Sequence, residues 1–373
     1  MKVLINGGGI AGLTCAIALN KLGIETEVYE AAAEIKPAGA GLVLQSNAIK
    51  ALEYLGIEDK IIEAGNPVNQ LAIYEANGRI IKRQRPDSKY REKFGGIAIH
   101  RHTLHEILKS YLDDNIFFLN KRAQSFSDDG EKVVLRFDDG TEAEGDYLIS
   151  ADGINSVIRQ KLVPDSKPRY AGYLCWRAVV ENNFGIKEAS ETWGKKGRFG
   201  IVPINENNIY WFAVITGHQF DSKLNNFTVE DIAEHFSGFH KPVSEILSST
   251  PGSALIFNSI SDLEPLNRFA YNNVLLTGDA AHAVTPNLGQ GACQAIEDMM
   301  VLHQEISVHK DLKTAFKSFE QRRLARTKFI TETSRKMGAM AQSGNTLLMA
   351  IRNFLFRMIP EFVTARQLNK IYN

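Results

Sequence analysis

Two glycine-rich segments far apart in the chain carry the residue types that bind dinucleotides. Near the N-terminus, Gly7, Gly9 and Gly12 form a G-x-G-x-x-G pattern directly after the apolar run Val3-Leu4-Ile5. In such a pattern Gly7 allows a tight turn, Gly9 lets a pyrophosphate approach the backbone, and Gly12 lets a helix pack closely on a strand. The phosphates would meet the positive end of that helix. We therefore expect a dinucleotide site at a strand-to-helix turn.

An acidic residue supports this interpretation. Glu30 ends a second strand-like run about twenty residues beyond the glycines, where a carboxylate can accept hydrogen bonds from ribose hydroxyls. A solvated charge at a strand end is the alternative. In the late segment, Asp279 follows an apolar strand, and Pro286 to Gly291 predict a helix N-terminus. One helix terminus contributes about 1 kcal/mol towards an anion, whereas nanomolar affinity needs about 12 kcal/mol. Both segments together would be needed to hold one long dinucleotide.

Composition agrees with an ordinary enzyme. The 373 residues include 43 Lys and Arg against 43 Asp and Glu, a net charge of zero that favours neither nucleic acid nor an acidic membrane as partner. The three cysteines have no metal-ligand spacing, so no metal site is predicted. We expect each of them to be a small buried residue and not half of a disulfide, which fits a reducing compartment, so cytoplasmic residence is expected. No apolar run reaches membrane-spanning length. Residues 346–362 predict an amphipathic helix packed on its own protein, with peripheral membrane or lipophilic-substrate contact as the alternative.

The order of predicted elements indicates an interleaved α/β design. Strand, helix and strand alternate around both glycine-rich segments, while residues 172–259 are rich in alternating strands. A hairpin turns at Asn77-Gly78, and a helix begins near Arg101. We expect a nucleotide-binding domain from residues 1–70, 100–165 and 265–335, a β-sheet domain from 71–99 and 166–264, and a C-terminal helical segment over 336–373.

Three motifs in matching order carry a family resemblance. Gly7-x-Gly9-x-x-Gly12, the central Asp152-Gly153 and the late Gly278-Asp279 resemble the motif set of single-component (class A) FAD-dependent aromatic monooxygenases of the para-hydroxybenzoate hydroxylase type. The resemblance implies a Rossmann-like FAD-binding domain of the glutathione-reductase ββα variant, with a second β-rich substrate domain and C-terminal helices. It also implies that NAD(P)H, as a transient co-substrate, reduces FAD, and that O₂ then gives a C4a-hydroperoxide that hydroxylates a small aromatic or heteroaromatic compound. The absence of a second G-x-G-x-x-G pattern agrees with this, because these enzymes lack a separate nicotinamide domain.

The same resemblance assigns cofactor contacts residue by residue. Asp279 would hydrogen-bond the ribityl or ribose part of FAD, and Val43 and Ala123 would offer backbone contacts. The residues expected to bind FAD are Gly7, Gly9, Ala11, Gly12, Glu30, Ala31, Val43, Arg101, Ala123, Asp152, Asp279, Gly289, Gln290 and Gly291.

Three residues are candidates for the catalytic site. Arg198 and Tyr210 lie on strand-like runs joined by a polar turn, so they could face one cavity and hold a substrate. The alternative is that Arg198 is a solvated strand residue and Tyr210 an ordinary core residue. The pair resembles one in bacterial FAD-dependent urate hydroxylases, although Asn287 stands where those enzymes have an aspartate. Because an amide cannot act as a general base, urate is placed in doubt. The Pro-Asn-Leu-Gly-Gln-Gly wording is shared with members that resemble zeaxanthin epoxidase.

Several alternatives stay open from the sequence. The enzyme could inactivate a polycyclic antibiotic by oxygenation or epoxidise an isoprenoid, and a non-enzyme reading is a binding protein of the GDP-dissociation-inhibitor type. A monomer and a homodimer are both compatible with the sequence. Trp176, Arg177 and Trp211 would line a pocket or form sheet core, His282 is expected to be structural, and the basic run over 322–328 is expected to be a solvated helix face.

Overall fold

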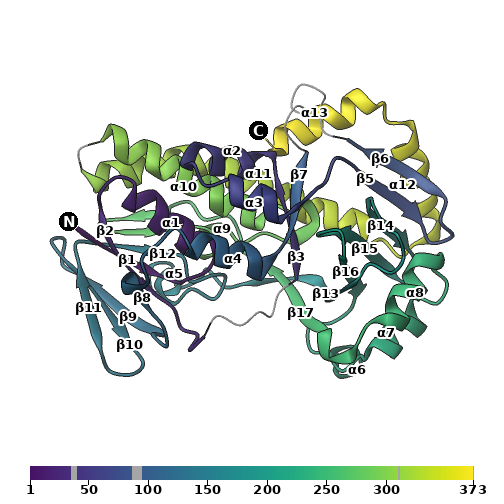
Figure 1. The fold of residues 1–373 in the computed structure, drawn as a ribbon, viewed down its shortest axis with the longest axis horizontal. Coiled ribbons are helices and arrows are strands. Elements are labelled where there is room, and N and C mark those ends of the chain that lie inside the picture. Colours follow the sequence, from purple (N-terminus) through teal and green to yellow (C-terminus); the bar gives the residue numbers. More distant parts are fainter. Residues whose placement is uncertain (35–39, 86–94, 310, 373) are drawn as a thin grey trace.

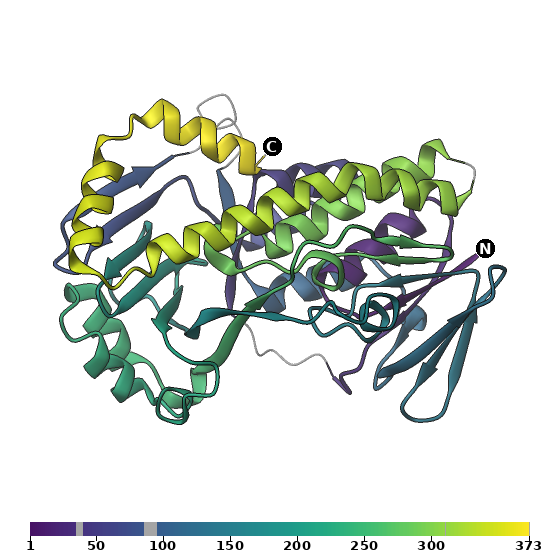
Figure 2. The same ribbon diagram turned by 180° about the vertical axis from the view of Figure 1, so that it is seen from behind.

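The computed structural model describes residues 1–34, 40–85, 95–309 and 311–372. Two lobes lie side by side, one built on a largely parallel sheet and the other on a larger, mostly antiparallel sheet (Figure 1). Seen from behind, two long helices run along the parallel-sheet lobe, and one of them continues onto the second lobe (Figure 2). The predicted α/β class is confirmed.

The first lobe is organised around a six-stranded sheet whose central strands are parallel. Strand β1 (Lys2–Asn6) pairs with β2 (Glu25–Tyr29) and β12 (Tyr147–Ser150) and follows the apolar pattern that a strand covered on both faces requires. Helix α1 (Ile10–Asn20) follows β1 at once and is buried almost all round, between the sheet and α10 (Gly291–Val308). In spatial order the strands are β18 (Ala270–Tyr271), β19 (Val274–Leu276), β12 (Tyr147–Ser150), β1 (Lys2–Asn6), β2 (Glu25–Tyr29) and β8 (Phe117–Phe118).

Two small sheets extend this lobe. One is an antiparallel meander of β9 (Ala123–Asp128), β10 (Val133–Phe137) and β11 (Glu142–Gly145). The other joins β3 (Gly41–Gln45), β7 (Gly96–His100) and β4 (Asn66–Pro67). Strand β7 was expected in the β-sheet domain, but its pairing with β3 places it with the first lobe instead. The remaining helices here are α2 (Ser46–Leu55), α3 (Asp59–Ala64), α4 (Arg101–Lys109), α5 (Val157–Leu162) and α9 (Asp279–His282), with 3-10 turns at Asp114–Ile116 and Pro286–Leu288.

The second lobe contains a seven-stranded sheet with strict alternation of its side chains. Phe199, Trp211 and Trp176 point to one face, where they form the core under the short helices α7 (Val229–His235) and α8 (Lys241–Ser249). The opposite face is turned towards the first lobe and lines the cavity described below. In spatial order the strands are β17 (Ile256–Asp262), β13 (Arg169–Glu181), β16 (Asn208–Thr216), β15 (Gly197–Pro203), β14 (Ala189–Gly194), β5 (Leu71–Glu75) and β6 (Ile80–Gln84). The short helices are α6 (Ser222–Asn225), α7 (Val229–His235) and α8 (Lys241–Ser249), with a 3-10 turn at Gly252–Ala254.

Three helices complete the chain. Helix α11 (Leu312–Ala341) runs through the expected domain boundary at residue 336 without a break. Helices α12 (Thr346–Met358) and α13 (Glu361–Tyr372) then cross the β5–β6 hairpin, whose predicted Asn77-Gly78 turn is confirmed. The predicted amphipathic helix forms as α12, but its apolar stripe faces outward instead of packing on the protein. Residues 86–94 of the expected β-sheet domain lie outside the described residues.

Candidate active site

A cavity of about 870 Å³ joins the two lobes. The turns after β1, β2, β12 and β19 line one end of it, and β13, β15 and β16 line the other. Twelve of the fourteen expected FAD contacts line the cavity, and Arg198, Tyr210 and Asn287 line it too. The two exceptions are Gly12, which lies behind the first turn, and Gln290, which is fully buried. The Gln290 side chain bonds to Asn47 and Gln294 instead of facing the cavity.

The three N-terminal glycines meet three different steric demands. Gly7 has a φ of +110°, and a Cβ there would lie 2.4 Å from the carbonyl oxygen of Ala151. A Cβ on Gly12 would lie 1.9 Å from the carbonyl oxygen of Gly7, so helix α1 could not pack this closely on the turn. Gly9, the N-cap of α1, has open space where a side chain would stand. The turn therefore leaves room above the helix N-terminus, as a pyrophosphate needs.

Glu30 fixes the edge of this turn. One carboxylate oxygen accepts a 2.8 Å hydrogen bond from the backbone N–H of Gly8, and the other accepts one of 2.8 Å from Ala32. Each oxygen keeps a free acceptor position, because a carboxylate oxygen can accept two hydrogen bonds. The side chain borders the cavity, so it is placed to receive hydroxyl donors from a ribose.

Asp279 and Asp152 are two further carboxylates that line the cavity. The Asp279 side chain is exposed to the cavity, and desolvation by the surrounding protein raises its pKa, while the nearby positive charges of His282 and Arg101 act in the opposite direction. Burial likewise raises the pKa of Asp152, which accepts hydrogen bonds from the Ser150 hydroxyl and, at 3.2 Å, from the N–H of Val157. Both groups are therefore positioned as hydrogen-bonding groups inside the cavity.

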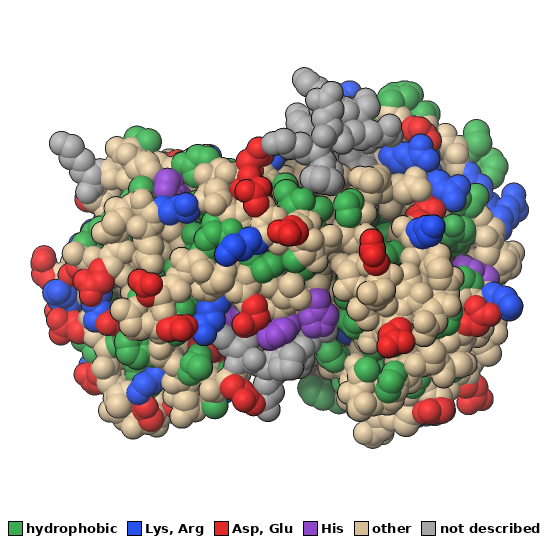
Figure 3. All heavy atoms as spheres, viewed as in Figure 1, with side chains coloured by type: hydrophobic (Ala, Val, Ile, Leu, Met, Phe, Trp, Pro, Cys, Tyr) green, Lys and Arg blue, Asp and Glu red, His purple; other side chains and the backbone are tan. Residues whose placement is uncertain are grey.

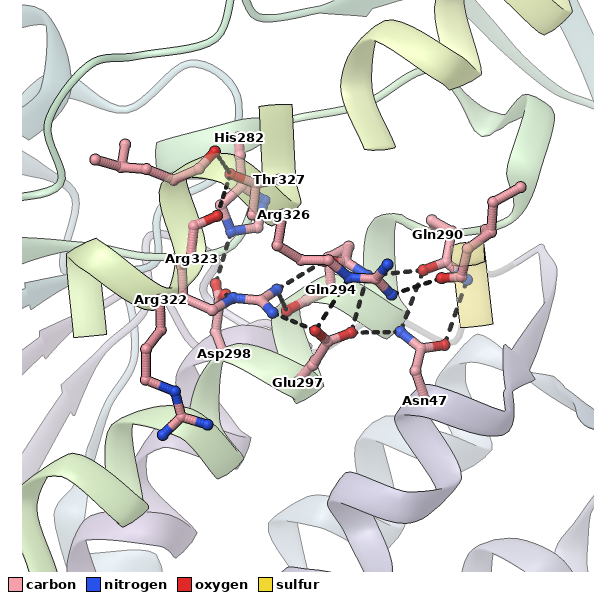
Figure 4. A network of polar contacts seen from close by, with 12 residues as sticks. Asn47, His282, Gln290, Gln294, Glu297, Asp298, Arg322, Arg323, Arg326 and Thr327 are labelled. Atoms are coloured by element: carbon pink, nitrogen blue, oxygen red, sulfur yellow. Dashed lines mark hydrogen bonds and ion pairs between the residues drawn. The ribbon is translucent and has the colours of Figure 1, made fainter. Parts of the chain in front are cut away.

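A buried ionic network holds the late glycine segment in place (Figure 4). The Asp298 carboxylate accepts hydrogen bonds from the N–H of Gly278 at 2.9 Å and from His282 at 2.7 Å, and it pairs with Arg323 at 2.7 Å. Arg323 also pairs with Glu297, which accepts a 2.7 Å bond from Asn47 on α2. The expected structural role of His282 agrees with this arrangement.

The same network corrects one prediction. The basic run over 322–328 is not a solvated face throughout, because Arg323 is only 2% exposed and Thr327 is buried as well. Arg326 reaches further and donates to the backbone carbonyls of Lys370 and Ile371 at 2.6 Å each. The run therefore connects the start of α10, which borders the cavity, to the last helix of the structure.

Arg198 and Tyr210 face the cavity together, because β15 and β16 pair so that residues 198, 202, 210 and 214 share one face. All three nitrogens of the Arg198 guanidinium are engaged. They donate to Glu191 at 2.9 Å, to Asn287 at 2.7 Å and to Gln342 at 3.3 Å. The Arg198 charge is therefore already balanced by a carboxylate on the neighbouring strand β14.

Asn287 acts as a connector at the end of the cavity nearest α11. Its carbonyl oxygen accepts from Arg198, and its amide nitrogen lies 2.8 Å from the Tyr173 hydroxyl and 3.0 Å from the carbonyl of Ser334. An amide holds these partners in place without exchanging a proton.

The aromatic residues of the second lobe divide between its two faces. Trp176 and Trp211 are fully buried in the sheet core, so the core alternative holds for both. Arg177 instead lines the cavity, one strand away from Tyr210. A Cβ on Gly41 would lie 2.5 Å from the Cβ of Tyr210, so a glycine is required where β3 passes this side chain.

The C-terminal helices form a cavity wall that the sequence did not predict. Their inward side chains meet Trp193 and Ile73 of the seven-stranded sheet, and the Phe356 ring lies 5.5 Å from that of Trp193. The only available signal was the helical spacing of apolar residues after 346, which does not say what they contact. The lining residues from this region are Phe356, Ile359, Thr364, Gln367, Leu368, Ile371 and Tyr372.

The arrangement fits a long dinucleotide. Two helix N-termini, those of α1 and α10, border one cavity, and the open position at Gly9 admits a phosphate next to backbone N–H groups.

Within the described ranges, no group of three or more His, Cys, Asp and Glu side chains could hold a metal ion. Among the same residues, no helix is long and apolar enough to cross a membrane.

Comparison with known proteins identifies the class. Residues 1–334 match the family model described as FAD binding domain, so the chain belongs to this family. It is an FAD-dependent monooxygenase of the aromatic hydroxylase type, with FAD as cofactor and NAD(P)H as the reductant typical of the family. The resemblance seen in the sequence is thus confirmed, and the binding-protein alternative is set aside.

Three relatives show how similar the chain is to characterised members. It is 36% identical to the aurachin C monooxygenase/isomerase of Stigmatella aurantiaca, over 96% of this chain and 94% of that protein. It is 33% identical to the 2-heptyl-3-hydroxy-4(1H)-quinolone synthase of Pseudomonas aeruginosa, over 96% of this chain and 94% of that protein. The crystal structure of Klebsiella pneumoniae HpxO complexed with FAD and uric acid superposes with a TM-score of 0.91 and 27% identity, covering 100% of this chain and 96% of that one.

Proposed function

We propose that this enzyme uses NAD(P)H and O₂ to hydroxylate a neutral heteroaromatic ring that carries an aliphatic chain, with 2-alkyl-4-quinolones as the model class. The Stigmatella and Pseudomonas relatives support this choice, since the name of the second describes a quinolone with a heptyl chain and a hydroxyl group. The FAD contacts would be those that line the cavity on the first lobe, and Arg198, Tyr210 and Asn287 would form the substrate end.

The observation that carries the proposal is the ion pair between Arg198 and Glu191. An anionic ring would need the positive charge of Arg198 as its counter-charge. The Glu191 carboxylate, 2.9 Å away, already neutralises that charge. Glu191 lines the cavity as well, so it would repel a second anion there. A neutral ring meets neither penalty, and the asparagine at position 287 also argues against urate.

The apolar wall supports an aliphatic substituent. Phe356, Ile359 and Leu368 line the cavity beside the β5–β6 hairpin. Each buried CH₂ group is worth about 0.8 kcal/mol, so a heptyl chain could contribute up to about 5 kcal/mol of binding. The aliphatic substituent would lie against this wall while the ring faces Tyr210.

The residues of the second lobe would orient the ring and exclude water. FAD, when bound, supplies the redox chemistry with NAD(P)H and O₂. Burial raises the pKa of the Tyr210 phenol, so the group stays protonated at neutral pH and can donate to a ring carbonyl. Asn287 would hold Arg198 and Tyr173 in position and take no proton. The apolar lining would keep the reacting carbon dry.

A substrate comparison tests the proposal. FAD-loaded protein is mixed with 2-heptyl-4-quinolone, urate or 3-hydroxybenzoate, and NAD(P)H oxidation, peroxide release and product mass are measured. We expect the quinolone alone to stimulate NAD(P)H oxidation with low peroxide release and to gain one oxygen atom. Coupled hydroxylation of urate or 3-hydroxybenzoate, without turnover of the quinolone, would overturn the proposal.

A charge variant tests its central observation. Glu191→Gln leaves the Arg198 charge unbalanced, so 3-hydroxybenzoate should bind about tenfold more tightly, as followed by flavin fluorescence. Glu188→Gln, which changes an acid paired with Arg83 at the sheet edge, is the matched control. Equal affinities in both variants would show that Glu191 does not set the charge preference.

We also propose that the enzyme resides in the cytoplasm, because the reductant and the free, buried cysteines suit a reducing compartment.

A further inference from the structure

Helix α12 packs on the protein with its polar side inward. Arg352 and Asn353 are 7% and 5% exposed. The Arg352 guanidinium donates to the carbonyls of Met340 and Ala341 at 3.1 and 3.0 Å, and the Asn353 amide donates to Glu75 at 3.1 Å. These hydrogen bonds fix the rotation of α12 about its own axis.

The opposite side of α12 is apolar and exposed. A surface helix normally buries its apolar stripe and turns its polar side to water, so this orientation is the reverse of the usual one. The exposed side chains recur at helical spacing and form one continuous strip, which marks an interaction surface. We call this strip the α12 face; it consists of Leu347, Leu348, Ile351, Phe354, Leu355 and Met358, continued by Phe362 on α13, with exposed fractions from 48% to 74%.

Basic side chains outnumber acidic ones in the two chain segments that lie next to the α12 face, although the whole chain is neutral. Residues 342–373 contain four basic side chains and one acidic one, and so do residues 71–85. Of these, Arg352 is buried on the inward side of α12, and Arg83 and Arg357 are paired with Glu188 and Glu75. The basic excess therefore consists of Arg79, Lys82, Arg85, Arg366 and Lys370. The two segments are in contact, because Lys82 donates to the carbonyl of Ile359 at 2.5 Å and Arg357 pairs with Glu75 at 2.7 Å. Basic and hydrophobic side chains lie together over the region where Figure 1 places β6, α12 and α13 (Figure 3).

We propose that the α12 face docks on the surface of an anionic lipid bilayer. An exposed apolar strip beside basic side chains is the pattern of helices that lie in the membrane interface, where the strip enters the acyl boundary and the cations meet lipid phosphates. A second copy of the chain would match the apolar strip but would bring two positively charged surroundings together. The charge around the strip therefore favours anionic lipid over self-association.

Docking in this orientation would place the cavity beside the lipid. The helices that carry the α12 face also present Phe356, Ile359 and Leu368 to the cavity. If the proposed function holds, a substrate with an aliphatic chain would reach the enzyme from the bilayer. The docking itself depends only on the outward face and its charge, so it can be tested without any substrate.

Vesicle co-sedimentation of the FAD-loaded protein tests the docking. Wild-type protein is mixed with vesicles of phosphatidylglycerol or of phosphatidylcholine at low and high salt. We expect strong sedimentation with phosphatidylglycerol, weakened by salt, and little with phosphatidylcholine. Phe354→Ser combined with Leu355→Ser should lower the affinity for phosphatidylglycerol vesicles at least about tenfold. The matched control is Phe220→Ser, because Phe220 is 86% exposed and shortly precedes α6, which lies apart from α12 in Figure 1.

Three results would overturn the proposal. One is a wild-type protein that stays in the supernatant with phosphatidylglycerol at low salt. Another is a double variant that binds vesicles as well as the Phe220→Ser control. The third is light scattering in which the double substitution converts a dimer into a monomer while vesicle binding is absent throughout. Failure of the quinolone assay would leave the vesicle result unchanged, so the two proposals fail separately.

Discussion

Two adjacent arginines on α11 provide a sharp test of the buried network. Arg323 is 2% exposed and pairs with Asp298 and Glu297, whose side chains are 0% and 12% exposed. The Arg322 side chain is 44% exposed and forms an ion pair with Glu305. Replacing each in turn by methionine removes the same charge from the same helix, one from inside the protein and one from its surface.

The structure sets the size of the two effects. Removing one partner of a buried ion pair costs about 3–5 kcal/mol of unfolding free energy, because a charge is left unpaired in the interior. In Arg323→Met, Asp298 would keep His282 at 2.7 Å and Glu297 would keep Arg326 at 3.4 Å, so we expect the lower end, about 3 kcal/mol. In Arg322→Met the Glu305 side chain is 11% exposed but keeps His309 at 3.4 Å, and the arginine that is removed is 44% exposed, so we expect about 1 kcal/mol, the upper end for an exposed pair.

The loss should also depend on pH. Burial raises the pKa of Asp298 and Glu297, but neighbouring cations outweigh it, and both pKa values lie below their ordinary range. Groups with lowered pKa stabilise the fold above the pKa of the unfolded chain, and that contribution disappears as the pH falls through the folded pKa. The difference between wild type and Arg323→Met should therefore be full at pH 7 and shrink below about pH 4.

Urea unfolding of FAD-loaded protein, followed by far-ultraviolet circular dichroism, measures these differences. A local probe is available as well, since Cys293 lies on α10 beside the network and is fully buried. Its reaction with a thiol reagent should become faster in Arg323→Met and stay slow in Arg322→Met. Equal urea midpoints for the two variants at pH 7, or a loss that grows on acidification, would refute the reasoning.

Three further outcomes are expected. Glu30→Ala should weaken FAD binding about tenfold to a hundredfold, because the charge-assisted hydrogen bonds from Gly8 of the glycine turn and from Ala32 are lost. Glu30→Gln should lie between the wild type and Glu30→Ala, and an unchanged fluorescence titration would contradict the assigned role. Gly41→Ala should lower kcat/KM and leave the amount of bound FAD unchanged, because the new Cβ displaces Tyr210. The control Gly252→Ala has nothing near its Cβ position and should not change the kinetics. Equal kinetics of the two variants would count against Tyr210 as a substrate contact. Burial raises the pKa of the Cys293 thiol to about 12, so native protein at pH 8 should resist thiol reagents until it unfolds, and rapid labelling of folded protein would contradict this.

The sequence was most informative where local geometry decides the outcome. Steric demands at Gly7 and Gly12, and the alternation that places Arg198 beside Tyr210, depend on neighbours in the chain or on one strand pairing. Glu191 was missed because its pairing with Arg198 depends on the register of β14 against β15, which side-chain pattern alone does not determine.

Faces of helices were the other source of error. Periodicity identified α12 correctly but could not say which side would be buried, since the hydrogen bonds of Arg352 and Asn353 to distant segments decide that. The run over 322–328 failed for the same reason: a charged helix looks solvated until buried carboxylates on another helix are known. Both errors come from long-range contacts that no single segment encodes.

The alternation of β13, β15 and β16 has a consequence for engineering and for evolution. Successive residues along each strand point to opposite faces of the sheet, so Arg198 and Val202 line the cavity, while Phe199 and Ile201 pack in the core of the second lobe. A mutant library confined to cavity-facing positions would sample new substrate preferences at little cost to folding yield. The same number of changes shifted by one residue would mostly give insoluble protein. Diversification within this scaffold is therefore expected to proceed in steps of two along each strand.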